Sequence, residues 1–189
     1  FIGSVISTVT VIRIAMVGSR TAVASMLLAG IAINSIAGAG TGVLIYMADE
    51  DRLRDLTFWT LGSFGGATWT QVKLAVFVIL IPSICAIFLS RSLNVMLHGE
   101  AQAYMLGVKL ERLKKIIVAL VCLIVGSSVS MAGMIGFVGL VVPHLCRLMF
   151  GPDNRKVVPA SILLGGSLLL GSDLLSRLII IPAELPIGI

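Results

Sequence analysis

Charged residues are scarce in this sequence. Of its 189 residues, 12% are charged and 58% are hydrophobic, whereas an ordinary soluble domain has about 25% charged and roughly 45–50% apolar residues. A water-soluble core could not bury that excess. Uncharged stretches recur that are long enough to cross about 30 Å of hydrocarbon, which takes about 20 helical residues. The sequence therefore predicts an all-α, polytopic transmembrane helical bundle in a lipid bilayer, formed by residues 1–189 as a single domain.

Residues and motifs that carry chemistry are also few. The three cysteines are well separated, and neither they nor the two histidines form a C-x-x-C or an H-E-x-x-H pattern, so we expect no metal site. The chain lacks a G-x-x-x-x-G-K-[ST] loop, and any ATP must be used by a partner subunit. No acid/base pair of the kind found in catalytic centres stands out. We expect a transport subunit without catalytic residues or a bound cofactor, not an enzyme.

The uncharged run at residues 116–146 decides the predicted topology. As one helix it would extend about 46 Å at 1.5 Å per residue, well beyond the ~30 Å hydrocarbon core. Its glycines offer a break, so we expect a full helix, a turn at 133–137, and a shorter helix returning to Arg147. Further apolar segments are expected at residues 1–17, 21–47, 74–89 (with a kink at Pro82) and 157–172, and a last one begins after Glu184.

The distribution of basic residues supports two crossings in that run. All Lys and Arg residues then fall on one side of the membrane except Arg52, Arg54, Lys73 and Arg177. By the positive-inside rule, the 91–115 loop is cytoplasmic and the 48–70 loop is periplasmic. This interpretation also explains the net charge of +5 without a nucleic acid partner, because the basic residues lie between apolar segments and form no single basic face.

Small and polar residues recur on one predicted helix. Gly30, Asn34, Gly38 and Gly42 are spaced by four, which places them on one helix face where another backbone can approach closely. Helix packing is one interpretation. Lining of a translocation path by Asn34, Gly38 and Gly42 is the other, and both can hold together.

Several segments resemble one known family. The string GEAQAYMLGV at 99–108 is similar to the coupling segment of the FecCD family of ABC importer permeases. The strings LLAGIAIN, WTLGSFGGATW, GMIGFVGLVVPHLCRLMFGPDNR, PASILLGGSLLLGSDLLSRL and AELPIGI extend this resemblance over nearly the whole chain. The resemblance implies the type II importer permease fold, with about six to seven of its ten helices present. Because the sequence begins at Phe1 and stops at Ile189 inside apolar runs, we expect a fragment of a longer protein.

The resemblance also implies partners and residue roles. Family members form homodimers in the bacterial inner membrane, bind two cytoplasmic ATPase subunits and receive substrate from a periplasmic binding protein. Arg177 matches an outer-side arginine that pairs with a glutamate of the binding protein, with Arg52 and Arg54 as further docking candidates, whereas an internal ion pair between Asp173 and Arg177 is the alternative. The residues expected to contact the ATPase are Gly99, Glu100, Ala103, Leu106, Gly107 and Val108.

The identity of the substrate stays open at this stage. The string GVLIYMADEDRLRDLTFWTLGSFGGATW most resembles the haem branch of the family, so we expect haem or an iron complex. A ferric siderophore and cobalamin are alternatives within the family. An ion-coupled secondary transporter is the alternative from another class, but such a protein is expected to carry ionisable residues near the membrane midplane, which are nearly absent here.

Overall fold

The computed structural model describes residues 2–17, 20–21 and 23–179, and nearly all of its elements are helices. A two-residue antiparallel pair, β1 with β2, joins the first two helices. The predicted all-α class is confirmed. The elements are α1 (Ile2–Ala15), β1 (Met16–Val17), β2 (Arg20–Thr21), α2 (Val23–Tyr46), α3 (Glu50–Leu61), α4 (Trp69–Ala75), the π-helix η1 (Val76–Leu80), α5 (Ile81–Met96), α6 (Glu100–Met105), α7 (Leu110–Ala132), α8 (Val138–Phe150) and α9 (Asn154–Ile179).

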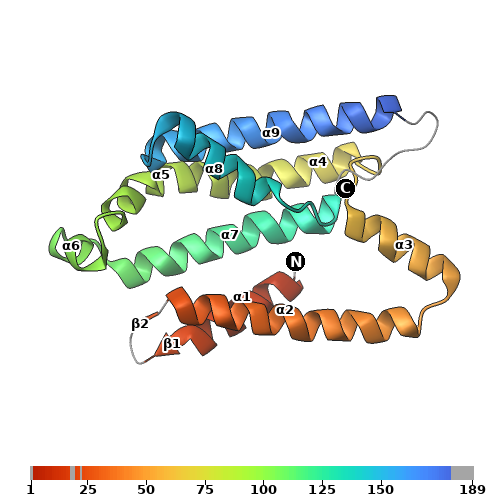
Figure 1. The fold of residues 1–189 in the computed structure, drawn as a ribbon, viewed down its shortest axis with the longest axis horizontal. Coiled ribbons are helices and arrows are strands. Elements are labelled where there is room, and N and C mark those ends of the chain that lie inside the picture. Colours follow the sequence, from red (N-terminus) through yellow and green to blue (C-terminus); the bar gives the residue numbers. More distant parts are fainter. Residues whose placement is uncertain (1, 18–19, 22, 180–189) are drawn as a thin grey trace.

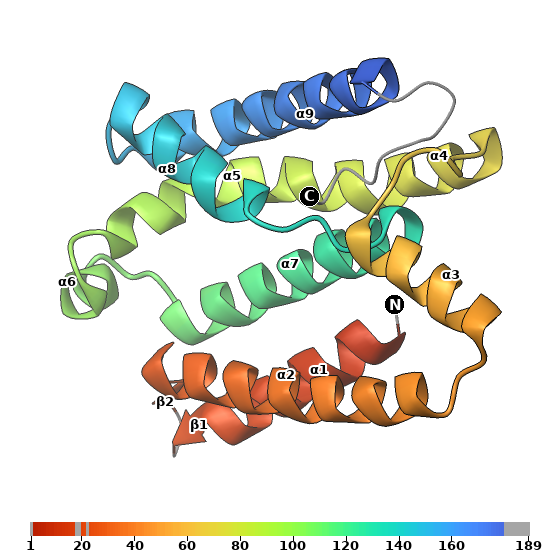
Figure 2. The same ribbon diagram turned by 45° about the vertical axis from the view of Figure 1, so that its right-hand side comes forward.

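The long helices lie side by side with their axes in a common direction, as Figures 1 and 2 show. Packing proceeds from α2 to α1, then to α7, α5 and α9, and α8 packs on α9. In the described part of the chain, four helical stretches are long and apolar enough to cross a bilayer, namely α2, α4 to α5, α7 and α9, while α1 and α8 are shorter apolar helices. The chain is therefore a multi-pass membrane protein.

The predicted break in the long uncharged run is confirmed. The helix α7 ends at Ala132 and α8 begins at Val138. Gly133 follows α7 with φ 74° and ψ −168°, a conformation that is essentially restricted to glycine. Phe137 precedes α8 with a φ of 59°. The backbone thus reverses between these residues, and α8 returns alongside α9 (Figure 1).

The apolar segment predicted at residues 74–89 lies inside a longer helical stretch. This stretch runs from Trp69 to Met96 through α4, η1 and α5. A capping box between Thr68 and Gln71 starts it earlier, because these two side chains satisfy backbone N–H groups that a helix start leaves unpaired. The π-helix η1 precedes Pro82. The wider turns of a π-helix accommodate the proline, which lacks the N–H that the regular helix hydrogen bond needs.

The two predicted loops are largely helical. Residues 48–70 contain α3, and residues 91–115 contain the end of α5, all of α6 and the start of α7. In Figure 1, α6, the β1–β2 pair and the α8–α9 turn lie at one end of the bundle, and α3, the start of α4 and the end of α9 lie at the other. This is the grouping that the two-crossing topology requires. That the α6 end is cytoplasmic and the α3 end periplasmic stays a prediction.

Few side chains are buried in this part of the chain. The main cluster joins α8 to α9 through Val142, Cys146 and Val157, which are at most 3% exposed. Cys146 therefore serves as a small apolar core residue, as the apolar sequence around it suggests. Large apolar side chains such as Leu28 and Ile36 remain exposed along α2. In a membrane, these surfaces contact lipid or further helices.

Two glycines bring α3 against the turn between α7 and α8. The backbone N–H of Ser63 donates to the carbonyl oxygen of Ala132 at 2.9 Å. Gly62 has a φ of 67°, and a Cβ there would lie 2.7 Å from the carbonyl oxygen of Met134. A Cβ on Gly133 would lie 2.9 Å from the Cα of Gly62. Only residues without side chains permit this close backbone contact.

We expect Gly133→Ala to destabilise the protein. The backbone conformation alone costs a non-glycine residue roughly 1–3 kcal/mol, and the methyl group would also displace α3. The measurement is thermal unfolding in detergent. Gly136→Ala is the matched control, because a Cβ there meets no atom within 4 Å, and its effect should stay within about 0.5 kcal/mol. Equal stability of the two variants would show that the close contact does not hold α3 in place.

Candidate functional site

The short helix α6 is bounded by two glycines with positive φ. Gly99 precedes it with φ 101° and ψ 154°, which is again a conformation that only glycine adopts readily. Gly107 follows it with a φ of 78°. The N–H of Gly107 donates to the carbonyl of Tyr104 at 3.0 Å, and that of Val108 donates to Ala103 at 3.1 Å. These two bonds form a Schellman motif, which explains why a glycine stands at position 107.

The residues of α6 divide into a buried anchor and an exposed tip. Ala103 is fully buried, and α6 packs against α5 and α7. Tyr104, Met105 and Leu106 are 76%, 85% and 71% exposed. The side chain of Glu100 lies outside the described part of the structure. Of the predicted contact residues, Gly99, Ala103 and Gly107 thus shape the helix, and Leu106 belongs to an apolar tip that also contains Tyr104 and Met105, two residues that the motif did not identify.

The end of α5 is attached to the start of α9 by hydrogen bonds. The carboxamide of Asn94 donates from Nδ2 to the carboxylate of Asp153, and its Oδ1 accepts the backbone N–H of Asn154 at 2.7 Å. The same carboxylate accepts the N–H of Arg155 at 2.9 Å. The hydrogen bond from Asn94, followed by that from the backbone of Arg155, lowers the pKa of Asp153 below its ordinary value of 3.8. Asp153 is therefore ionised at neutral pH.

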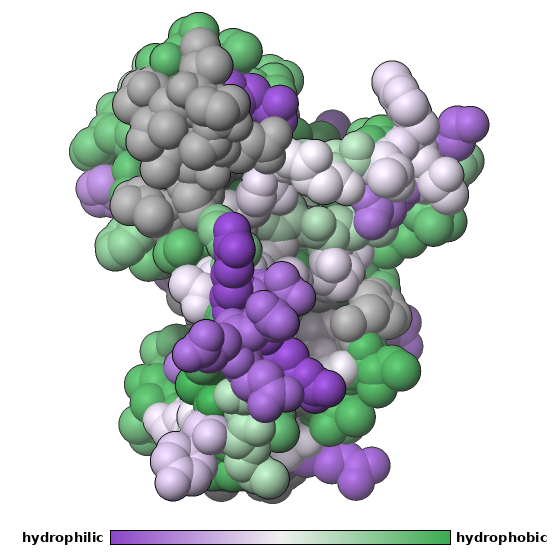
Figure 3. Space-filling view, turned by 90° about the vertical axis from the view of Figure 1, so that its right-hand side faces the viewer, coloured by the Kyte–Doolittle hydropathy of each residue, from purple (hydrophilic) through white to green (hydrophobic). Residues whose placement is uncertain are grey.

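The predicted docking residues lie at the opposite end of the bundle. Arg177, near the end of α9, forms an ion pair with Asp173 in which Nε and Oδ2 are 2.9 Å apart. Its side chain is 47% exposed, so the pair leaves part of the guanidinium accessible. Arg52 and Arg54 are exposed on α3, and Arg54 lies 5.8 Å from the centre of the Phe58 ring. Figure 3 looks onto this end and shows hydrophilic residues gathered across its middle, between apolar surfaces.

The predicted translocation residues lie on α2. This helix packs chiefly against α1. Asn34 lines a shallow groove of about 380 Å³ together with Ser7, Thr8 and other residues of α1, α2 and α7. A Cβ at Gly38 or Gly42 would meet nothing within 4 Å. The two glycines therefore face open space in this chain, and the structure does not bring them together with the groove.

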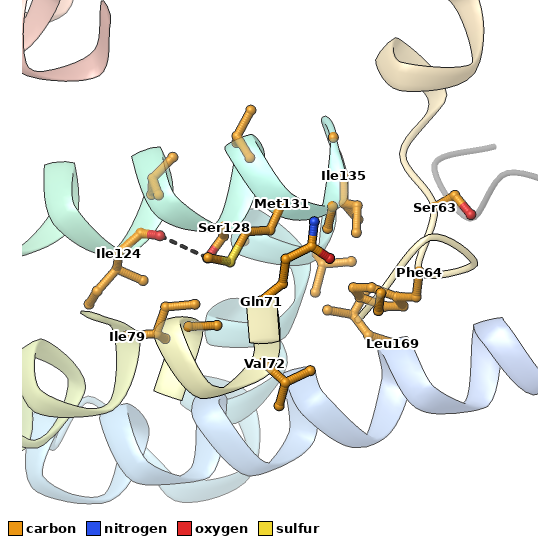
Figure 4. A pocket seen from close by; sticks show the side chains of 18 residues that line it. Ser63, Phe64, Gln71, Val72, Ile79, Ile124, Ser128, Met131, Ile135 and Leu169 are labelled. Carbon is orange, nitrogen blue, oxygen red and sulfur yellow. Dashed lines mark hydrogen bonds between the residues drawn. The ribbon is translucent and has the colours of Figure 1, made fainter. Parts of the chain in front are cut away.

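A larger cavity of about 520 Å³ lies near the other face of α7. Figure 4 shows that Val72 of α4, Met131 of α7 and Leu169 of α9 lie around it. Its polar side chains are engaged by the backbone. Ser128 donates to the carbonyl of Ile124 at 2.7 Å, and Gln71 accepts from the N–H of Thr68 at 3.0 Å. The cavity is thus apolar, and sequence reasoning did not find it because its walls come from four separate stretches of the chain.

The described residues bring no three His, Cys, Asp or Glu side chains together in a metal-binding group. The other features described here are an apolar tip on α6 at one end, basic residues on α3 and α9 at the other, and the exposed face of α2 between them.

Comparison with known proteins places these features in a family. Residues 1–189 match the FecCD transport family. The chain is 39% identical to the hemin transport system permease protein HmuU of Yersinia pestis, over all of this chain and 56% of that protein. It is 37% identical to the cobalamin import system permease protein BtuC of Halobacterium salinarum, over all of this chain and 50% of that protein. The chain spans about half the length of the curated relatives it matches.

A solved structure agrees with this assignment. A transporter described as metal-chelate type, in an inward-facing conformation, superimposes with a TM-score of 0.84 at 30% sequence identity. The similarity covers 88% of this chain and 54% of that one. The chain belongs to the FecCD transport family.

Proposed function

We propose that the chain is part of the permease subunit of an ATP-binding cassette importer in a bacterial inner membrane. The observation that carries the proposal is the tip of α6. Tyr104, Met105 and Leu106 are all more than 70% exposed, and α6 lies at one end of the bundle (Figure 1). A cluster of exposed apolar side chains on a rigid, glycine-bounded helix is suited to insertion into a pocket of another protein. The partner is a cytoplasmic ATPase, two copies of which serve a permease dimer and hydrolyse the ATP.

A second copy of the permease is the proposed neighbour of α2. The described part of α2 exposes large apolar residues such as Leu28 and Ile36, together with Gly38 and Gly42. A surface that combines glycines with apolar side chains allows close helix approach in a membrane. A translocation path between two copies, with Asn34, Gly38 and Gly42 along it, is consistent with this exposure. A chain that binds no cofactor itself can provide such a path.

Haem or a related iron complex is the proposed substrate. The resemblance of residues 42–69 to the haem branch and the 39% identity to a hemin transport permease support it. Cobalamin has nearly equal support, since a cobalamin import permease is 37% identical. A ferric siderophore is the third candidate. Haem and cobalamin are both large ligands built around a tetrapyrrole-type macrocycle, so a wide path with few polar side chains is compatible with either.

We expect Met105→Glu in the full-length permease to abolish ATPase binding. The side chain is 85% exposed, so folding should tolerate the carboxylate, whereas an apolar pocket on the partner would have to desolvate it. The measurement is co-purification of the ATPase from detergent extracts, with an expected loss of at least roughly tenfold. Met47→Glu is the matched control, because Met47 is 76% exposed at the far end of α2. Full co-purification with Met105→Glu would contradict docking through α6.

We also expect Arg177→Glu to weaken docking of a periplasmic binding protein. A guanidinium favours charge-assisted pairing with a carboxylate on the partner, and charge reversal should lower the affinity by roughly tenfold or more. The measurement is the dissociation constant for the binding protein on permease in nanodiscs. Asp173→Asn is the control, because it removes the internal ion pair and leaves the guanidinium in place. If reversal at Arg177 leaves the affinity unchanged, the assignment of this residue is wrong.

A further inference from the structure

The hydrogen bonds around Asn94 connect two units that are otherwise separate in sequence. On one side, α5 continues past Asn94 to Met96, and backbone bonds from Leu97, His98 and Gly99 carry the chain in an unbroken series of turns to α6. On the other side, Asp153 and Asn154 stand at the start of α9. Figures 1 and 2 both show the end of α5, α6 and the α8–α9 turn at the same end of the bundle.

The side chain of Asn94 forms two hydrogen bonds across this contact. Asn94 uses its amide as donor and acceptor at once, toward Asp153 and Asn154. A side chain engaged at both its N–H and its carbonyl cannot rotate without losing a bond. Asn154 is 7% exposed, whereas Asn94 and Asp153 are only partly buried, so the bond to the backbone of Asn154 is the one shielded from water. Because Asp153 is ionised, the bond from Asn94 is charge-assisted and roughly twice as strong as one between neutral groups.

The α9 side of the contact is itself firmly attached to α8. Val142, Cys146 and Val157 pack together between the two helices, with Leu164 against them. Val157 lies one helical turn from Asp153. The two helices are therefore expected to move as one unit, which we call the α8–α9 hairpin. From Asp153, α9 extends about 36 Å to the level of Arg177 at 1.5 Å per residue.

We propose that Asn94 and Asp153 are positioning residues of the transport cycle, forming the link through which displacement of α6 is passed from α5 to the α8–α9 hairpin. The inference rests on the proposed function, because it assumes that an ATPase moves α6. The direct packing of α5 on α9 and the contact between α6 and α7 are further routes. The link differs from these packing contacts because it is polar and is formed by two identified residues. Its amide and carboxylate can therefore be exchanged between positions 94 and 153 by mutation.

The test uses the full-length permease with its ATPase and binding protein in proteoliposomes. Cargo is haem, or cobalamin if only cobalamin is taken up by the unchanged complex. ATP hydrolysis and uptake are measured together for the unchanged protein, Asn94→Asp, Asp153→Asn and the double variant with both changes. Asn94→Asp places two carboxylates opposite each other. Asp153→Asn replaces the carboxylate, so that two neutral amides face each other. The double variant again pairs an amide with a carboxylate, with the two positions exchanged.

We expect Asn94→Asp to retain ATPase binding and hydrolysis while uptake per ATP falls by roughly 2- to 30-fold, the range seen when residues between coupled sites are changed. Asp153→Asn should show a smaller decrease, and the double variant should recover to within about twofold of the unchanged protein. A purely structural role would lower the amount of assembled complex and leave uptake per ATP constant. If Asn94→Asp does not assemble, Asp153→Asn and the double variant give the same comparison.

Two results would overturn the inference. One is unchanged uptake per ATP in every variant that assembles, which would assign transmission to helix packing, either of α5 on α9 or of α6 on α7. The other is a double variant no better than Asn94→Asp, which would show that the pairing itself is not what matters. Failure of the proposed function is recognised separately, because the unchanged complex would then show no ATP-dependent uptake of either cargo.

Discussion

The structure depends on one constraint, that a chain crossing hydrocarbon must satisfy its backbone hydrogen bonds within its own helices. Long helices follow from it, and they can be interrupted only where the freed groups find other partners. Five interruptions in the described residues coincide with glycines of positive φ, namely Gly62, Gly99, Gly107, Gly133 and Gly151. At each, glycine adopts a backbone conformation that would strain another residue. The positions of α6 and of the turn between α7 and α8 follow from these breaks.

The same constraint separates the functional surfaces. Because the helices extend from one membrane boundary to the other, the tip of α6 and the basic residues of α3 and α9 lie at opposite ends (Figure 1). A signal between them must pass along helices and across the contacts that join helices. In the described part of the chain, such contacts include the apolar cluster of α8 with α9 and the polar link at Asn94. Whether movement at one end of the bundle reaches the other end therefore depends on which helices move together.

The fold was largely predictable from sequence, because length and charge limit how an apolar run can cross a bilayer. The break at 133–137 followed from a run too long for one crossing. Contacts between distant residues were not predictable. Asn94 and Asp153 lie 59 positions apart, and no local pattern pairs Gly62 with Gly133. The start of α4 was not predicted, because Gln71 and Lys73 interrupt the apolar pattern. A capping box nevertheless begins the helix before these two polar residues. The segment AELPIGI lies outside the described residues.

The central claim is that ATP hydrolysis by a partner drives import through this permease. The most direct measurement is uptake into proteoliposomes that hold the full-length permease, its ATPase and its binding protein, with haem, a ferric siderophore and cobalamin offered in parallel. We expect haem to accumulate only when ATP is supplied on the ATPase side. Uptake of another of these compounds with ATP would retain the importer and replace the substrate. Uptake that ignores ATP and follows an ion gradient would contradict the account.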